Sequence, residues 1–283
     1  MTQGQDRRPD ADYPTRLPSA DLKMDIPHPA RMYDYYLGGK DNFAADREAA
    51  EQVLRIVPEL RMAARMNRAF LGRAIQFAAV SGIDQFLDIG TGIPTAGNTH
   101  EVAQQVNPLA KVAYVDNDPI VLTHARALMS GTGHGVTKVV QADLRDPQRI
   151  LADPVVRGLI DFDRPVALVL AAILHFIHDD DDPCGLVAQL LEPLVPGSML
   201  ILSHGSWEAE GEDFSGRAAQ MKTPYNRASA QLHLRSQGEI ERLFAGVELV
   251  EPGMVTLATW RAEPTHEEWD GSRGFFGGVG IKR

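Results

Sequence analysis

The chain has 283 residues, a length typical of one large domain or two small ones. Hydrophobic residues make up 44% and charged residues 23%, which excludes a wholly disordered chain. The net charge of −10 argues against general attraction to nucleic acid phosphates, without excluding a local basic groove, so we expect no nucleic acid partner. The single cysteine, Cys184, cannot form an internal disulfide, which indicates a reducing compartment.

No segment has the composition of a membrane span. The longest apolar run, Val166 to Leu174, is far shorter than the roughly 20 residues that a bilayer requires. Residues 1–25 contain no apolar core of a secretory signal, and their Pro, Asp and Arg content is typical of a disordered tail. We therefore expect a cytoplasmic protein with a disordered tail over residues 1–25 and no membrane association.

Residues 26–82 have a helical pattern throughout. A short helix over 28–37 is predicted to end at paired glycines. A second helix is predicted over 43–57 with Asp41 and Asn42 as its cap, and a third continues to the end of the segment. The sequence therefore predicts an N-terminal helical cap, residues 26–82, on a larger domain.

From residue 83 onward the pattern changes to alternating strands and helices. Helices are predicted after Asn98, over 119–129 and over 183–194. Repeated strand–helix units form parallel sheets with helices on both faces, so residues 83–283 predict a doubly wound α/β domain. The predicted parallel strands are 85–89, 111–115, 136–141, 166–172 and 198–203.

The end of the chain departs from this alternation. Ser236 and Glu239 form a capping-box pattern before a helix over 240–244. Strand patterns at 247–255 and 275–282 then predict an antiparallel hairpin that closes one edge of the sheet. A dinucleotide-binding half-domain does not predict that hairpin.

Three carboxylates follow successive predicted strands: Asp88, Asp116 and Asp143. In an open α/β sheet the ligand lies beyond the carboxyl ends of the strands. An acid after the second strand can accept hydrogen bonds from both hydroxyls of a ribose, and one after the third can accept from an adenine amine. The three acids together indicate a ligand that contains an adenosyl group.

The predicted ligand is not a dinucleotide. That fingerprint needs a glycine where this chain has Thr95, and Pro94 also disfavours close approach of a helix to a pyrophosphate. Asp88 would repel phosphate, whereas it suits an ammonium or a sulfonium group. The adenosyl compound with positive charge and no phosphate is S-adenosylmethionine, which is therefore the predicted cofactor.

Several motifs also carry a family resemblance. DIGTGIPT at 88–95, YVDNDP at 114–119 and ADLRDP at 142–147 resemble motifs of the class I methyltransferases. The chain is also similar to the bacterial S-adenosyl methyltransferase family formerly filed as a domain of unknown function. The segments that carry this likeness are RMYDYYLGGKDNFAADR at 31–47, the Asn67-Arg68 pair, DIGTGIPTAGNTHE, AAILHFIHDDDDP at 171–183 and ELVEPGMV at 248–255. The resemblance covers about residues 26–283 and implies a Rossmann-like fold with S-adenosylmethionine as cofactor and S-adenosylhomocysteine as product, but it supplies no acceptor.

The resemblance also implies residue roles. The glycines after Asp88 would face the methionine part of the cofactor, and Asp88 would help to hold the turn and the amino group. Asp116 would bind the ribose, Asp143 with Leu144 would frame the adenine, and the Ala171 carbonyl would accept from the amino group. From its charge, Arg68 is a candidate partner for the cofactor's carboxylate. The expected cofactor-binding residues are Asp88, Gly90, Thr91, Gly92, Asp116, Asn117, Asp143, Leu144, Ala171 and Arg68.

The exit of the fourth strand bears on the acceptor. It lacks the Asn/Asp-Pro-Pro-aromatic run frequent in methyltransferases of nucleobases or amides, and it is similar to the Leu-His segment of small-molecule O-methyltransferases. His175 could act as a general base for a hydroxyl acceptor, or it could cap a helix or line the cofactor site. Asp179 to Asp182 could bind a metal, but consecutive acids before Pro183 are typical of a helix N-terminus, so no metal site is predicted.

The N-terminal helices carry an aromatic cluster with paired glycines between two helices. We expect the segment from Tyr33 to Asn42 to close over the cofactor and form part of the acceptor pocket. The competing interpretation packs these helices on the far side of the sheet, where they would only stabilise it.

The predicted function is therefore an S-adenosylmethionine-dependent methyltransferase acting on oxygen or nitrogen of a small-molecule acceptor. Two alternatives stay open. One is a sensor or partner module that binds S-adenosylmethionine or S-adenosylhomocysteine without methyl transfer, and the other is a nicotinamide-dependent dehydrogenase. The sequence predicts neither the acceptor nor the oligomeric state.

Overall fold

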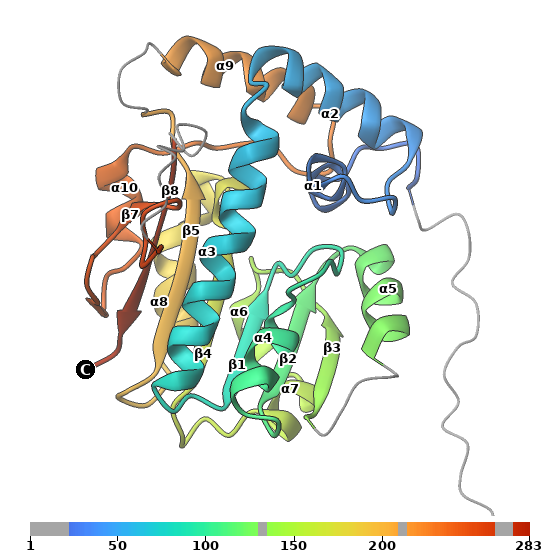
Figure 1. Ribbon diagram of the computed structural model, residues 1–283. Coiled ribbons are helices and arrows are strands. Elements are labelled where there is room, and N and C mark those ends of the chain that lie inside the picture. Colours follow the sequence, from blue (N-terminus) through green and yellow to red (C-terminus); the bar gives the residue numbers. More distant parts are fainter. Residues whose placement is uncertain (1–22, 130–134, 209–213, 264–273) are drawn as a thin grey trace, which may run out of the picture.

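The structure, a computed structural model, describes residues 23–129, 135–208, 214–263 and 274–283. Most of the predicted disordered tail, residues 1–22, lies outside the described residues. The described part forms a sheet with helices on both faces and a further layer of helices beyond the carboxyl ends of the strands (Figure 1). None of the described helices is long and apolar enough to cross a membrane.

The sheet has the strand order β3-β2-β1-β4-β5-β8-β6, and β7 pairs with β8. β1 to β5 are mutually parallel. β8 runs antiparallel to β5, β6 and β7. The strands are β1 Gln85–Ile89, β2 Lys111–Asp116, β3 Thr137–Gln141, β4 Ala167–Ala171, β5 Met199–Gly205, β6 Glu248–Leu249, β7 Val255–Thr256 and β8 Phe275–Ile281.

The predicted fold class is confirmed: a mostly parallel, doubly wound sheet of Rossmann-like type with an antiparallel C-terminal strand pair. One strand prediction is wrong in detail, because residues 247–255 form two short strands rather than one. Pro252 has no N–H to donate to a strand partner, and Gly253 has a φ of +87°, so the extended backbone is interrupted between β6 and β7.

The predicted helices are present in the expected order, although the helix predicted over 183–194 ends at 191 and the helix predicted over 240–244 spans 237–242. The two short helices between β3 and β4 have no counterpart in the prediction. Both predicted capping boxes are present: Glu101 accepts from the Asn98 N–H at 2.9 Å, and Glu239 accepts from the Ser236 N–H at 2.8 Å. The helices are α1 Pro29–Leu37, α2 Ala44–Ile56, α3 Leu60–Val80, α4 Thr99–Val106, α5 Pro119–Met129, α6 Pro147–Ala152, α7 Pro154–Leu159, α8 Pro183–Leu191, α9 Phe214–Tyr225 and α10 Gln237–Arg242, with 3₁₀ turns η2 Leu174–Phe176 and η3 Asp179–Asp181.

The start of α2 differs from the prediction that Asp41 and Asn42 cap it. The Asn42 side chain instead donates to the buried Asp34 carboxylate at 2.8 Å. The backbone N–H of Phe43, which has no partner within the helix, donates to Asp46 at 2.8 Å. A carboxylate inside the first turn therefore provides the acceptor for the N-terminal end of the helix. The prediction failed because the preference of Asn42 for Asp34 depends on tertiary folding.

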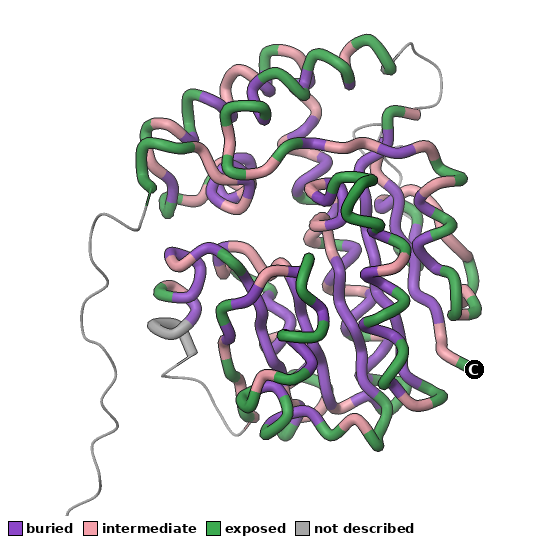
Figure 2. The backbone as a smooth tube through the Cα atoms, turned by 180° about the vertical axis from the view of Figure 1, so that it is seen from behind, coloured by how far each residue is buried: buried purple, intermediate pink, exposed green. Residues whose placement is uncertain are grey.

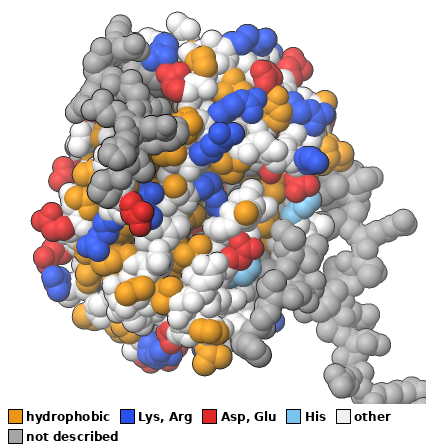
Figure 3. Space-filling view, in the orientation of Figure 1, with side chains coloured by type: hydrophobic (Ala, Val, Ile, Leu, Met, Phe, Trp, Pro, Cys, Tyr) orange, Lys and Arg blue, Asp and Glu red, His pale blue; other side chains and the backbone are white. Residues whose placement is uncertain are grey.

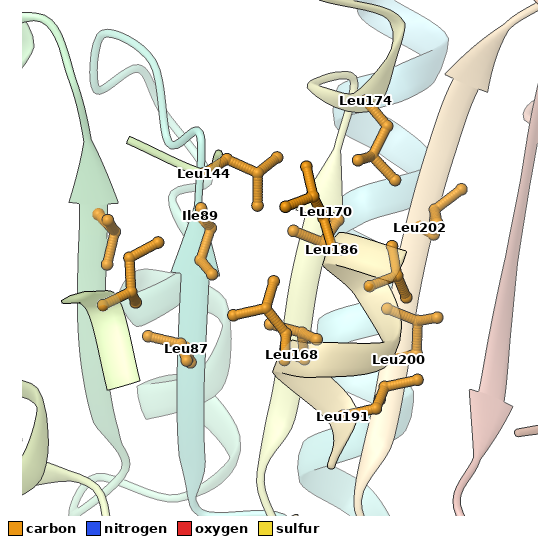
Figure 4. Packing of buried hydrophobic residues seen from close by; sticks show 14 of the residues in the cluster. Leu87, Ile89, Leu144, Leu168, Leu170, Leu174, Leu186, Leu191, Leu200 and Leu202 are labelled. Atoms are coloured by element: carbon orange, nitrogen blue, oxygen red, sulfur yellow. The ribbon is translucent and has the colours of Figure 1, made fainter. Parts of the chain in front are cut away.

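Alternate residues along each strand enter two different cores. Leu87 and Leu168 point to the face covered by α6, α7, α8 and α10. Phe86 and Val169 point to the opposite face, which α3 and α4 cover. Figure 4 shows the leucines of β1, β4 and β5 packed against those of α8. Burial on both faces explains why these strands are almost continuously apolar.

A third apolar cluster joins α1, α2, α9 and the first half of α3. We call α1, α2 and α9 the helical cover; it lies beyond the carboxyl ends of the strands (Figure 1). Seen from behind, buried residues run along the strands, whereas much of the outer side of the cover is exposed (Figure 2). The second half of α3 packs on the sheet through Phe70 and Ile75. Residues 26–82 thus contribute both to the cover and to a helix on the sheet.

A buried guanidinium connects the cover to the loop after β2. Arg31 of α1 is 2% exposed, and its Nε lies 3.4 Å from Asp46 Oδ1 of α2 and 3.8 Å from Asp118 Oδ2. Its Nη2 also donates to the Ile26 carbonyl at 2.8 Å. One cation therefore lies between two buried carboxylates that belong to different layers.

We predict that Arg31→Leu lowers the free energy of unfolding by about 3–5 kcal/mol, because it leaves Asp46 and Asp118 buried without their cation. Urea denaturation followed by circular dichroism measures this loss. Arg61→Leu, at the start of α3, is the matched control, since its ion pair with Glu51 of the cover is exposed and such pairs contribute less than about 1 kcal/mol. Equal losses in the two variants would contradict the prediction.

Candidate functional site

A cavity of about 1000 Å³ lies between the carboxyl ends of β1 to β4 and the helical cover. The turns after these four strands form one side of it, and Tyr33, Tyr36, Met221 and Tyr225 of the cover line the other. The structure brings every site residue predicted from the sequence into this one lining: Arg68, Asp88, Gly90, Thr91, Gly92, Asp116, Asn117, Asp143, Leu144, Ala171 and His175.

The turn after β1 is tight and lies next to a buried acid, Asp88 of β1. Gly90 has a φ of +76°, and a Cβ at this position would overlap the Ile173 side chain, so only glycine fits. Asp88 accepts a 2.6 Å hydrogen bond from the Thr99 hydroxyl, and burial raises its pKa to about 6. The turn therefore presents closely approachable backbone next to a desolvated carboxyl group.

Asp116, at the end of β2, organises two turns at once. Its Oδ2 accepts from the Gly92 N–H and its Oδ1 from the Asp118 N–H, both at 2.9 Å. Burial raises its pKa to about 6 against the lowering effect of these hydrogen bonds. A carboxylate has about four acceptor sites, so each oxygen keeps capacity for a hydroxyl of a bound ribose.

Asp143, after β3, has the opposite electrostatic setting. Arg145 binds both of its oxygens, with Nη2 to Oδ2 at 2.6 Å and Nε to Oδ1 at 3.0 Å, and this lowers the pKa of Asp143 to about 2. Asn117 donates to the same carboxylate at 3.3 Å. The neighbouring Leu144 is buried and adds an apolar surface. Asp143 is therefore ionised at neutral pH and already paired.

The exit of β4 is held by a chain of buried hydrogen bonds. Ala172 has a φ of +54°, an unusual value for an L-residue, and its N–H donates to Ser203 Oγ at 2.9 Å. Ser203 donates to Asn67 Oδ1 at 2.6 Å, and the Asn67 amide donates to the Tyr33 hydroxyl at 2.9 Å. Because Tyr33 also donates to Ala64, the chain connects the β4 exit with the cover.

Arg68 extends from α3 toward the segment that precedes α4. Its Nη2 donates to the carbonyls of Ala96 and Gly97 at 3.3 and 3.2 Å. These contacts place its guanidinium beside the β1 turn, at the edge of the cavity.

His175 lines the cavity but is 5% exposed. Its Nδ1 accepts from the Gly205 N–H at 3.2 Å, which assigns the ring hydrogen to Nε2. Burial, with His204 and Arg235 nearby, lowers its pKa well below the ordinary value, so the ring is neutral at neutral pH. Arg235 also donates to the Leu174 carbonyl at 2.9 Å and thereby holds the turn that carries His175.

The acidic run after His178 has structural partners. Asp179 accepts from Arg235 at 2.6 Å, and Asp182 accepts from the Gly185 N–H at 3.0 Å and so caps α8. Within the described residues, no group of three or more His, Cys, Asp or Glu could hold a metal ion.

Sequence reasoning missed two features of this lining. Asn67 was noted only within a motif, and nothing local indicated its bond to Ser203. The Tyr36 hydroxyl lies 3.2 Å from that of Tyr225, a buried pair 189 positions apart in the chain. No local pattern in either helix predicts such a pairing.

Comparisons with known proteins agree on one family. The family model described as S-adenosyl methyltransferase matches residues 15–283. A DUF574 family protein from Streptomyces avermitilis MA-4680 is 43% identical, with a TM-score of 0.85 over 93% of this chain and 100% of that chain. A protein from Thermobifida fusca YX is 42% identical, with a TM-score of 0.85 over 93% of this chain and 97% of that chain. A search of curated proteins finds no match.

This chain belongs to the S-adenosyl methyltransferase family. The family confirms the predicted cofactor, S-adenosylmethionine, and the prediction of a methyltransferase, and it removes the dehydrogenase alternative. The lining is chemically suited to this cofactor: Asp88 and Asp116 are buried carboxylates with acceptor capacity left for hydroxyl or ammonium donors, and the turn at Gly90 carries no side chain.

We predict that Asp116→Ala weakens binding of S-adenosylhomocysteine by about 1–3 kcal/mol, because buried ribose hydroxyls lose their acceptor. Isothermal titration calorimetry measures this change. Affinity should also fall as the pH falls through about 6, where Asp116 takes up a proton in the free protein, and it should fall less steeply in Asp116→Asn.

Asp84→Ala is the matched control, since Asp84 precedes β1 at the opposite end of the sheet and pairs with Arg164. An unchanged dissociation constant in folded Asp116→Ala would remove this residue from the cofactor site.

Proposed function

We propose that this chain transfers the methyl group of S-adenosylmethionine to an oxygen or nitrogen atom of a small molecule held in the same cavity. The observation that carries the proposal is the size of the cavity and its place between the strand ends and the helical cover. At about 1000 Å³ it lies at the upper end of the range for single drug-sized ligands, so it has room for the cofactor and a small acceptor together.

The predicted roles of the strand-end residues fit this arrangement. Asp116 takes the ribose, and Asp143 with Leu144 frames the adenine. The turn at Gly90 and Gly92 takes the methionine part, with the Ala171 carbonyl and Asp88 near its ammonium group. Thr91, Asn117 and Arg68 complete the lining, Arg68 as the partner of the carboxylate.

S-adenosylmethionine supplies a methyl group on a positively charged sulfur, which is a good leaving group. The protein's contribution is therefore mainly to position the acceptor against the methyl group. The buried Asp88 and Asp116 carboxylates favour a cationic ligand over a phosphate.

His175 acts in this proposal as a positioning residue rather than a general base. Its Nδ1 already accepts a backbone hydrogen bond, and its neutral Nε2–H is a donor. The proton of a hydroxyl or amine acceptor then leaves to water. Of the two roles expected for His175 from the sequence, the proposal therefore favours capping a helix or lining the cofactor site over acting as a general base.

The position of the helical cover over the strand ends supports a small acceptor. α1 carries Tyr33 and Tyr36 into the lining, so the acceptor must fit between the cover and the strand ends. On the face drawn in Figure 3, basic and acidic side chains are interspersed, an arrangement unlike the basic stripe of nucleic acid binders.

The test is turnover with a small-molecule extract and S-adenosylmethionine labelled on its methyl group. We expect S-adenosylhomocysteine to accumulate and the label to enter a low-molecular-weight fraction, with both signals reduced in Asp116→Ala. Tight binding of S-adenosylmethionine without transfer to any fraction would instead support the alternative, a sensor or partner module.

A second test concerns the segment from Tyr33 to Asn42, which we propose closes over the cofactor. We expect slower amide hydrogen exchange at residues 33–42 when S-adenosylhomocysteine is bound, because Tyr33 is linked through Asn67 to the β4 exit. Protection limited to 88–95, 116–118 and 143–145 would contradict this role.

A further inference from the structure

We propose that the acceptor is an uncharged aromatic molecule, bound in the half of the cavity that faces the helical cover. This inference rests on the proposed function, because it assigns the space beside the cofactor. We call this half the aromatic chamber; it is lined by Tyr36, Phe176, Met221, Tyr225, Leu232 and Phe275.

The chamber is strongly apolar. Tyr36, Met221 and Leu232 are between 2% and 5% exposed and belong to the same apolar cluster as Tyr225. They come from α1, from α9 and from the segment after α9. Against such side chains a polar ligand would lose hydration without compensating hydrogen bonds, whereas an apolar ligand removes its own apolar surface from water.

Aromatic rings from separate elements meet in the chamber. The Phe176 ring lies 5.7 Å from that of Tyr225 and 4.5 Å from that of His175. The His175 ring lies 6.2 Å from that of Phe275, nearly perpendicular to it. Tilted and edge-on contacts of this kind are the arrangements that aromatic rings prefer, and a flat aromatic ligand can extend them.

The charged groups of the lining are paired or lie at the strand ends. Asp88 and Asp116 lie at the ends of β1 and β2, and Asp143 after β3 is paired with Arg145. Arg31 of α1 lies between Asp46 and Asp118, Arg68 donates to backbone carbonyls, and Lys23 precedes α1. Among the described residues, the lining positions within 173–178 and 221–234 contain no Asp, Glu, Lys or Arg.

Two histidines of these segments, His175 and His233, do not supply a charge either. Burial lowers the pKa of His175 and of His233, which favours their neutral forms. The ring of His178 lies edge-on to that of His233 at 4.5 Å. An ionised acceptor lying against these two segments would therefore lose its hydration without gaining an opposite charge from them, which is costly in a buried site.

The Tyr36 and Tyr225 hydroxyls give the chamber one polar feature. Their oxygens are 3.2 Å apart, so one hydroxyl donates to the other, and the second O–H stays available for a ligand oxygen. Burial raises the pKa of Tyr225 to about 12 and that of Tyr36 as well, so both phenols stay protonated. The pair can therefore orient a neutral acceptor without requiring charge.

The reaction balances for such an acceptor. A lone pair of its hydroxyl oxygen forms the new bond to the methyl carbon, and the electron pair of the broken carbon–sulfur bond stays on sulfur. The hydroxyl proton leaves to water. The products are a neutral methyl ether, S-adenosylhomocysteine and one proton.

The test compares two probes of the same shape, 2-naphthol and 2-naphthoate, by calorimetry with and without saturating S-adenosylhomocysteine. We expect 2-naphthol to bind at least tenfold more tightly than 2-naphthoate. Met221→Trp should fill the chamber and abolish this binding, while the dissociation constant of S-adenosylhomocysteine stays unchanged. The conservative double variant Tyr36→Phe with Tyr225→Phe should weaken 2-naphthol about tenfold.

Equal binding of the two probes, or binding that neither variant alters, would overturn the assignment of the chamber. If the wild-type protein does not bind S-adenosylhomocysteine at all, the proposed function is overturned instead. The probe preference measured without that ligand would still decide the chemistry of the chamber. Circular dichroism melting verifies that each variant is folded. If Met221→Trp does not fold, the double variant Tyr36→Phe with Tyr225→Phe still tests the assignment of the chamber.

Discussion

The ion cluster of Arg31 is the contact on which the site depends, because it holds the helical cover against the sheet. Its guanidinium lies between Asp46 in the cover and Asp118 after β2. The Asp118 N–H donates to Asp116, so the cover is joined within two residues of the carboxylate assigned to the ribose. A displaced cover would therefore disturb the cofactor site as well as the acceptor space.

A second connection reaches the sheet on the other side of the β1 turn. Tyr33, Asn67 and Ser203 form the hydrogen-bonded chain that ends at the left-handed Ala172. The unusual backbone at Ala172 is maintained because its N–H is satisfied by β5, and β5 is in turn bonded to α3. The cover is thus joined at β2 by charge and at β4 by neutral hydrogen bonds, with the cavity between the two.

Much of the sheet and of its acidic edge could be predicted from local sequence. Each strand is a short apolar run, and Asp88, Asp116 and Asp143 lie at or just after the carboxyl ends of successive strands, so parallel topology alone brings them to one edge. The cover could not be predicted in the same way, because its contacts join distant segments, as in the pair of Tyr36 and Tyr225. The cap of α2 was predicted wrongly for the same reason, since Asp34 acquires its preference for Asn42 only in the folded protein.

The two halves of the cavity differ in what burial does to them. Burial raises the pKa of Asp88 and Asp116 to about 6, so their ionised forms are less stable in the folded protein than in the unfolded chain. Their contribution to stability is therefore greatest below pH 4 or so and declines as the pH rises through about 6. In the proposed arrangement, the sulfonium and ammonium groups of the bound cofactor would offset that loss at neutral pH, whereas the aromatic residues of the chamber carry no buried carboxylate. The proposal therefore has the cofactor selected by charge, and its neighbour in the cavity by shape and apolar surface.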